Sequence, residues 1–300
     1  MGEYFSYLQH FTFYQFEKNA FRNIYYRGRN ALAFDPVTIE AIEAYRKNPP
    51  PLTDAERTLW ADRCVLELTN RFMEVNQYVH FSSREMALLQ EVYLQLLKEI
   101  ENPNIPIRTL EASHYRRLRS FIEHTNPSIF QLNRNEGQYA RRVMASEYPP
   151  DMQLQVLGVQ LEGMREPVLD IGCGKRGALV QYLRNMGYVA YGIDRQYEGT
   201  ESYIQRANYL EYDYGERKWG TVVSNLAFAS HFLYHHRAED GIDVTYAQAY
   251  HNILTGLQRG GKWYYAPSLP FMEGLLLPAD YDIRRRTVTH GHEATILTKK

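Results

Sequence analysis

Cysteine is scarce in this sequence. The 300 residues include 2 cysteines, Cys64 and Cys173, which stand far apart and lack the spacing of a metal-binding motif. We therefore expect no metal site. This cysteine usage also suits the reducing cytoplasm, where thiols persist and where we expect the protein to be located.

The sequence also lacks an excess of charge of one sign and a long apolar run. The formal net charge is -1, so no overall field draws the chain to nucleic acid or to anionic lipid. No run reaches the roughly 18 consecutive apolar residues that a membrane span needs. With 44% hydrophobic and 23% charged residues, the composition is that of an ordinary soluble protein. We expect neither a nucleic-acid partner nor a membrane partner.

Tyrosine, in contrast, is abundant. The chain holds 25 tyrosines, and aromatic residues crowd its beginning: Tyr4, Phe5, Tyr7, Phe11, Phe13, Tyr14, Phe16, Phe21, Tyr25 and Tyr26. A tyrosine combines a flat apolar face with a hydrogen-bonding tip, which suits an aromatic or amphipathic small molecule. Core packing, or a seam between the N-terminal arms of a homodimer, explains the same composition, and these alternatives stay open.

The pattern changes near residue 147. Residues 1–147 read as helices: Asp35-Pro36 begins one, and Thr53 with Glu56 has the spacing of a capping box that opens another, running to about Val75. Further helices are expected at 83–100, 110–124 and 136–146. Residues 148–300 instead alternate between strand and helix patterns. We therefore predict a helical N-terminal region and a separate C-terminal domain.

The C-terminal pattern predicts an α/β domain with a parallel sheet and right-handed crossovers. Strands are expected at 168–171, 188–193, 207–212, 221–224 and 263–266, with helices at 177–186 and 245–258. Two last strands, 283–289 and 294–298, flank His290-Gly291-His292 and read as a terminal hairpin. The predicted class is a Rossmann-like sheet closed by an antiparallel hairpin.

A glycine turn follows the first of these strands in the stretch VLDIGCGKRG, residues 168–177. Gly172, Gly174 and Gly177 match the pattern G-x-G-x-x-G, and Asp194 ends the next strand about 20 residues later. Ligands of open parallel sheets bind beyond the carboxyl ends of the strands, and a carboxylate there can accept hydrogen bonds from ribose hydroxyls. The arrangement predicts a ligand of the adenosine type.

Asp170 helps to choose that ligand. Its carboxylate stands two residues before Gly172 and would repel a pyrophosphate. S-adenosylmethionine has no phosphate and carries a sulfonium and an amino group, both positive, so it suits an acidic strand end. A structural role in the turn remains the alternative for Asp170 and for Asp194.

At this point residues 150–300 resemble the class I S-adenosylmethionine-dependent methyltransferases. The matching stretches occur in the family's order: VLDIGCGKRG, then GID at 192–194, LEYDYGERKWGTVVSNLAF at 210–228, and LQRGGKWYY at 257–265. The resemblance implies a fold with a terminal hairpin, S-adenosylmethionine as cofactor, and an N-terminal region that serves as lid and acceptor pocket. It implies these cofactor-binding residues: Asp170, Gly172, Gly174, Asp194, Arg195, Asp213, Tyr214, Asn225 and Leu226.

The resemblance also gives roles to some of these residues. It implies that Asp213 bonds the adenine amino group and that Tyr214 flanks the adenine ring, while Asn225 and Leu226 line the methionine side. Lys175 and Arg176 depart from the small residues often found in the turn.

The acceptor side is expected just after the fourth strand, in SNLAFASHFLYHH, residues 224–236. His231 is the candidate catalytic residue, as general base or as hydrogen-bond partner of the substrate, because histidine transfers protons near neutral pH. A packed or surface histidine is the alternative. His231 and His235 have helical metal-ligand spacing, but no nearby cysteine or paired acid completes a site. Asn225 is not followed by the prolines usual in enzymes that methylate nucleic-acid bases.

These observations favour a methyltransferase acting on oxygen or nitrogen of a small, aromatic or amphipathic molecule in secondary metabolism. Two alternatives remain. One is a protein or peptide methyltransferase that docks its partner through the N-terminal half, and the other is a protein that binds S-adenosylmethionine without catalysis.

Overall fold

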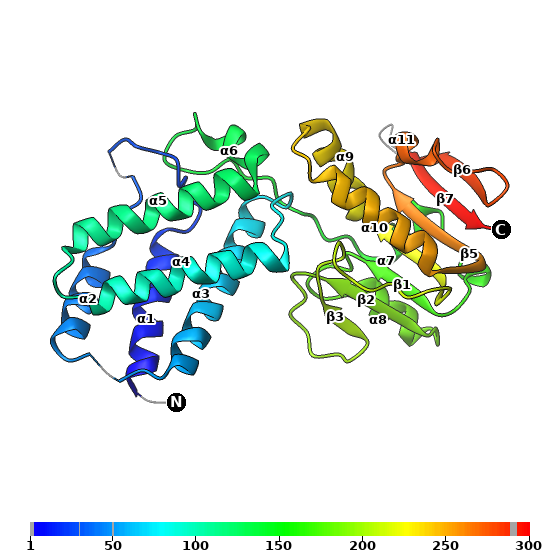
Figure 1. Cartoon of the computed structure of the whole chain (residues 1–300). Helices are drawn as coiled ribbons and strands as arrows, with labels where there is room; N and C mark the ends of the chain where they lie inside the picture. The colour runs from blue at the N-terminus through cyan, green and yellow to red at the C-terminus, as the bar shows by residue number, and fades with distance from the viewer. Residues whose placement is uncertain (1–2, 30, 50, 289–292) are drawn as a thin grey trace. The chain divides into compact units, whose positions relative to one another are not determined.

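The computed structural model describes residues 3–29, 31–49, 51–288 and 293–300. The chain forms two compact units, Met1–Ala145 and Ser146–Lys300. The first unit is helical and the second is built on a sheet, as Figure 1 shows. Each has a hydrophobic core of its own.

The helical unit packs its elements around a core that includes Trp60, Leu89 and Tyr93. Its helices are α1 (Glu3–Lys18), α2 (Pro36–Lys47), α3 (Asp54–Val75), α4 (Ser83–Glu101), α5 (Ile107–Thr125) and α6 (Pro127–Asn133). The predicted capping box is confirmed: Glu56 N donates to Thr53 Oγ1 at 3.2 Å, and Thr53 N donates to the Glu56 carboxylate at 2.9 Å. A second box, on Ser82 and Glu85, opens α4.

The helix predicted at 136–146 is wrong. Backbone groups of this stretch pair with distant segments instead of with each other. Val143 N donates to Val75 O at 2.8 Å, Gln77 N donates to Val143 O at 2.8 Å, and Ala140 N donates to Phe21 O. Because these groups are taken, they cannot form the i to i−4 ladder of a helix.

The sheet of the second unit has seven strands in the order β3-β2-β1-β4-β5-β7-β6. The strands are β1 (Val168–Ile171), β2 (Ala190–Asp194), β3 (Ile204–Arg206), β4 (Trp219–Asn225), β5 (Leu257–Ala266), β6 (Tyr281–Thr287) and β7 (Glu293–Lys299). The first five pair in parallel, and β7 runs antiparallel between β5 and β6. The predicted Rossmann-like sheet with a C-terminal antiparallel hairpin is confirmed. Residues His290-Gly291-His292 lie outside the described residues.

Helices cover both faces of this sheet, so β1 is buried along its whole length and β4 is buried in all but its last residue, Asn225 (Figure 1). On one face Leu169 and Val222 pack into a core with α9 (Phe228–Ala238) and α10 (Asp243–Gly256). On the other, Val168 and Val223 pack with α7 (Pro150–Leu157) and α8 (Ala178–Asn185). Neighbouring residues of a strand point to opposite faces, which explains the continuous apolar runs read in the sequence.

The strand predicted at 207–212 is wrong. The third strand is the shorter β3, and the following residues form turns. Asn208 accepts a hydrogen bond from Leu210 N at 3.1 Å. Such a local side-chain bond closes a turn in place of a strand ladder. The buried Tyr209 and Leu210 produced the apolar pattern that was read as a strand.

Candidate ligand site at the glycine turn

The strand order of the sheet reverses at β1, which lies between β2 and β4. In open parallel sheets, the carboxyl ends of the strands at such a point form a crevice. A cavity of about 250 Å³ lies here, lined by Gly172, Cys173, Gly174 and Asn225 together with side chains from the segment 146–153. The structure thus places a cavity where the sequence predicts a ligand.

The turn after β1 depends on glycine. Gly172, Gly174 and Gly177 have φ values of 76°, 80° and 60°, in the left-handed region that favours glycine. At Gly172 a Cβ atom would also lie 2.4 Å from the Cβ of Ala227. The three glycines therefore hold a conformation that leaves the backbone close to the cavity.

Asp194, at the end of β2, is tied to this turn. Its Oδ2 accepts a hydrogen bond from Gly174 N at 3.0 Å, and its Oδ1 accepts one from Gln196 N at 2.7 Å. Burial raises the pKa of the Asp194 carboxyl, while these two bonds and the nearby Arg195 act in the opposite direction. The second strand thus presents a carboxylate at the edge of the glycine turn, as predicted.

Asp170 is the most deeply buried acid of the site, with 1% of its surface exposed. Its Oδ2 has no hydrogen-bond partner among the described residues, and neither has the buried Oδ1 of Asn225, at the end of β4. Burial, reinforced by the charge of Asp194, raises the pKa of Asp170 to about 8. Two buried acceptors at adjacent strand ends are suited to a ligand that donates hydrogen bonds or carries positive charge.

Sequence reasoning missed Glu147. This residue lies just before α7, and its Oε1 accepts a hydrogen bond from Lys175 N, in the glycine turn, at 2.8 Å. Its other oxygen lies 3.6 Å from Arg176 Nε, while Lys175 pairs with Glu198 at 3.2 Å. No spacing rule links Glu147 to a turn 28 residues later, so the sequence carried no signal for this contact.

Of the nine predicted cofactor residues, Gly172, Gly174 and Asn225 line this cavity. The other six are not among its lining residues: Asp170, Asp194, Arg195, Asp213, Tyr214 and Leu226. Asp213 is exposed and its Oδ1 accepts from Gly215 N at 2.9 Å. Tyr214 is buried in the core, where its hydroxyl donates to Tyr209 O at 2.7 Å. Leu226 has a φ of 53°, and its N–H donates to Ala266 O. Their roles toward a cofactor stay predictions.

His231 lies in the first turns of α9 and is 7% exposed. Its Nδ1 is 2.8 Å from the hydroxyl of Tyr209, which is 3.2 Å from the hydroxyl of Tyr246. His235 is fully buried and pairs with Asp240 at 2.8 Å. The described residues contain no cluster of three side chains that could hold a metal ion. His231 therefore belongs to a buried, hydrogen-bonded aromatic group, and its catalytic role stays a prediction.

Within the described part of the chain, no helix combines the length and the apolar character needed to cross a membrane.

Comparison with known proteins gives matches among solved structures only. No family model matches the sequence, and no curated protein does. Among solved structures, a methyltransferase from Mesorhizobium loti is 20% identical with a TM-score of 0.26, and the match covers 44% of this chain and 56% of that one.

Two other solved structures are comparably distant. A sugar N-methyltransferase from a Streptoalloteichus species is 17% identical with a TM-score of 0.28, over 51% of this chain and 66% of that one. TrmN from Thermus thermophilus is 16% identical with a TM-score of 0.32, over 50% and 48%. We draw nothing on function from likenesses this low. It is the order of the strands and the antiparallel β7 that give residues 146–300 the Rossmann-like fold implied by their resemblance to class I methyltransferases.

Proposed function

We propose that the protein is an S-adenosylmethionine-dependent methyltransferase. The observation that carries this proposal is the buried, unpartnered carboxyl of Asp170 beside a glycine turn whose neighbouring strand ends in Asp194. A group that binds here gains by donating a hydrogen bond to this carboxyl or, where the carboxyl is charged, by carrying positive charge. A sulfonium compound with an amino group does so, whereas a dinucleotide pyrophosphate would add negative charge beside Asp170, Asp194 and Glu147.

The residues present fit such a cofactor. Asp194, beside Arg195, would accept from the ribose hydroxyls in addition to the two backbone bonds it already holds, and the turn at Gly172 and Gly174 would let the ligand approach the backbone. Asp170 and Asn225 offer acceptors to its positive end. When bound, the cofactor supplies a methyl group that its sulfonium has already activated. The protein's task is then mainly to align an acceptor with that methyl group.

For the acceptor we infer a small aromatic or amphipathic molecule of secondary metabolism, methylated on oxygen or nitrogen. His231 would accept the proton that such an acceptor loses. In the tautomer in which His231 Nδ1 donates to the Tyr209 oxygen, Nε2 is the basic atom, and Tyr209 acts as a positioning residue. The bond from Tyr209 to Tyr246 would continue this chain.

Calorimetry on the full chain tests the cofactor assignment. We expect S-adenosylmethionine and its demethylated product to bind and NAD not to bind. Asp194→Ala should weaken binding of both sulfur compounds at least about tenfold, the loss expected for hydrogen bonds to a charged group. Asp280→Ala, which removes an exposed carboxylate of the same unit, is the matched control and should leave both affinities unchanged. NAD binding without binding of the sulfonium compound would refute the proposal.

The role of His231 is tested separately, on an acceptor found by screening small phenols and amines. His231→Gln should lower kcat by roughly 100-fold, the usual contribution of a general base, with cofactor affinity preserved. Full turnover in this variant would show that His231 is only a packing residue.

A further inference from the structure

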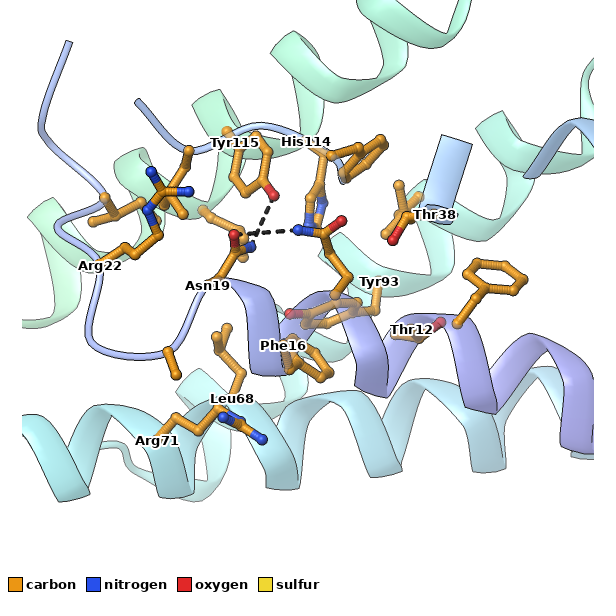
Figure 2. A pocket seen from close by; sticks show the side chains of 18 of the residues that line it. Thr12, Phe16, Asn19, Arg22, Thr38, Leu68, Arg71, Tyr93, His114 and Tyr115 are labelled. Atoms are coloured by element: carbon orange, nitrogen blue, oxygen red, sulfur yellow. Dashed lines mark hydrogen bonds between the residues drawn. The ribbon is translucent and has the colours of Figure 1, made fainter. Parts of the chain in front are cut away.

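A second cavity lies entirely inside the helical unit. Its volume is about 110 Å³, and it is lined by residues from α1 to α5 and from the segment between α1 and α2. An apolar protein cavity of about 150 Å³ is known to hold benzene, and a single water needs only about 10–15 Å³. This space is smaller than that benzene site but several times larger than a single water needs, and Figure 2 shows side chains that line it.

Aromatic rings form much of its wall. Tyr93 lies edge-on to His114 with ring centroids 5.5 Å apart, and edge-on to Phe16 at 6.1 Å. Phe34 lies 5.7 Å from Tyr115. Rings at these separations present both edges and faces, which favours a flat aromatic guest over a branched aliphatic one.

Three buried polar side chains of the wall have no hydrogen-bond partner among the described residues. They are Thr38 Oγ1, Tyr93 Oη and His114 Nδ1, and the residues are 3%, 1% and 5% exposed. They come from three different helices, α2, α4 and α5, yet line the same cavity, as Figure 2 shows. Native proteins leave few buried polar groups unpaired, so three around one cavity point to a guest that pairs with them.

The other uncharged polar side chains near them are already paired. Asn19 Nδ2 donates to Tyr115 Oη at 2.9 Å, and Gln15 Nε2 donates to Asn19 Oδ1 at 3.2 Å; both bonds are drawn in Figure 2. Gln15 also accepts from Asp35 N. Within this wall, therefore, most uncharged polar side chains are paired inside the chain, whereas Thr38, Tyr93 and His114 each leave an atom unpaired. The three unpaired atoms are therefore not a general feature of the wall.

Two arginines, Arg22 and Arg71, line the cavity, and both already have interactions within the chain, which favours an uncharged guest. Arg71 is held by Glu17 and by Glu67 at 2.5 and 2.6 Å. Burial lowers the pKa of His114 to about 3, so its ring is neutral near pH 7. An anion would have to compete with the two glutamates for Arg71 and would leave water for a largely apolar wall.

We propose that the helical unit contains a binding site of its own for a small, uncharged aromatic molecule that carries a hydroxyl group, with Thr38, Tyr93 and His114 as its hydrogen-bond partners. The site is independent of the proposed methyl transfer, because every residue that forms it belongs to residues 1–145.

The test is a fluorine NMR titration of the full chain with 4-fluorophenol, fluorobenzene and 4-fluorobenzoate. We expect 4-fluorophenol to bind most tightly, because its hydroxyl finds partners in the wall. Tyr93→Phe and Thr38→Val each remove one hydroxyl with little change of shape. Each substitution should lower the affinity for 4-fluorophenol by about fivefold, the value of one neutral hydrogen bond, and leave the affinity for fluorobenzene unchanged. Leu68→Trp should fill the cavity and abolish binding of both.

Tyr25→Phe is the matched control. The Tyr25 hydroxyl is also buried and unpartnered, but Tyr25 lies outside the cavity wall. This variant should keep both affinities. Fluorobenzene binding as tightly as 4-fluorophenol, or 4-fluorobenzoate binding more tightly, would overturn the assigned class of guest. Binding of none of the probes to the folded wild type, the result expected if only water fills the cavity, would overturn the site itself.

Discussion

At the scale of the residue, Asp170 makes the proposed function depend on pH. Burial raises the pKa of its carboxyl to about 8, so the group is neutral below that pH and charged above it. A cationic ligand gains most from the charged form. We expect the affinity for S-adenosylmethionine to rise between pH 6 and pH 8, by at most about tenfold per pH unit.

Calorimetry at pH 6, 7, 8 and 9 would measure this slope, and Asp170→Asn is the control. The variant should bind more weakly at pH 8 and should retain only the pH dependence of the ligand and of the other groups. An identical profile for wild type and variant would remove Asp170 from the ligand site.

His114 provides a test that does not involve the cofactor. In the folded state, burial and, to a smaller extent, the charge of Arg117 lower the pKa of the His114 ring to about 3 from an ordinary value near 6.5. Below pH 6.5 the unfolded chain takes up a proton that the folded chain does not. The stability contributed by the neutral ring is present above pH 6.5 and is lost as pH falls toward 3, by up to about 1.4 kcal/mol per pH unit.

Urea unfolding followed by circular dichroism at pH 7, 6 and 5 would show this loss. His114→Asn cannot take up the proton, so its free energy of unfolding should fall less steeply over the same range. Parallel curves for the two proteins would mean that the pKa of His114 is the same in the folded and unfolded states.

At the scale of the element, the capping boxes fix where two long helices begin. Thr53→Ala removes the acceptor for Glu56 N at the start of α3 and should lower the free energy of unfolding by about 1 kcal/mol. Thr53→Ser keeps the oxygen and should stay near the wild-type value. The measurement is urea denaturation at pH 7, and equal losses in both variants would contradict a capping role.

These caps also explain which elements the sequence could predict. The beginnings of α2 and α3 are marked by Asp35-Pro36 and by Thr53 with Glu56, signals confined to three or four residues. The stretch 136–146 could not be read in this way, because Val143 pairs with Val75 and Gln77, far away in the sequence. The periodicity of apolar residues indicates which side chains are buried, but it does not indicate which backbone groups pair with distant segments.

The two candidate binding sites differ in the same way, in whether their residues lie close together in the sequence. The glycine turn and Asp194 follow from one strand, one turn and the next strand, all local in sequence, and the structure joins them by the bond from Gly174 N to Asp194. The wall of the cavity in the helical unit comes from helices far apart in the chain. Thr38, Tyr93 and His114 share no spacing, so only the fold could bring them together.

At the scale of the whole molecule, the two units should respond separately to their ligands. Trp60 lies in the helical unit, and Trp219 and Trp263 lie in the sheet unit. In a Trp60→Phe variant, fluorescence reports the sheet unit alone. S-adenosylmethionine at 100 times its Kd should stabilise that unit by about 2.7 kcal/mol, because it binds only the folded state.

In a Trp219→Phe, Trp263→Phe double variant, the fluorescence of Trp60 reports the unfolding of the helical unit alone. There we expect 4-fluorophenol to raise the unfolding temperature and S-adenosylmethionine to leave it nearly unchanged. A shift of the same size in both units with either ligand would show that the chain unfolds as one cooperative body.

The contact between Glu147 and Lys175 N has a thermodynamic consequence for the proposed cofactor. The chain carries a carboxylate that already occupies a backbone amide of the glycine turn, and the cofactor brings a carboxylate of its own. If the cofactor's carboxylate binds at this amide, Glu147 must give up its hydrogen bond there, so the chain would compete with its own ligand for the site. Loading of the site would release the segment before α7, so the mobility of that segment would report the occupancy of the turn.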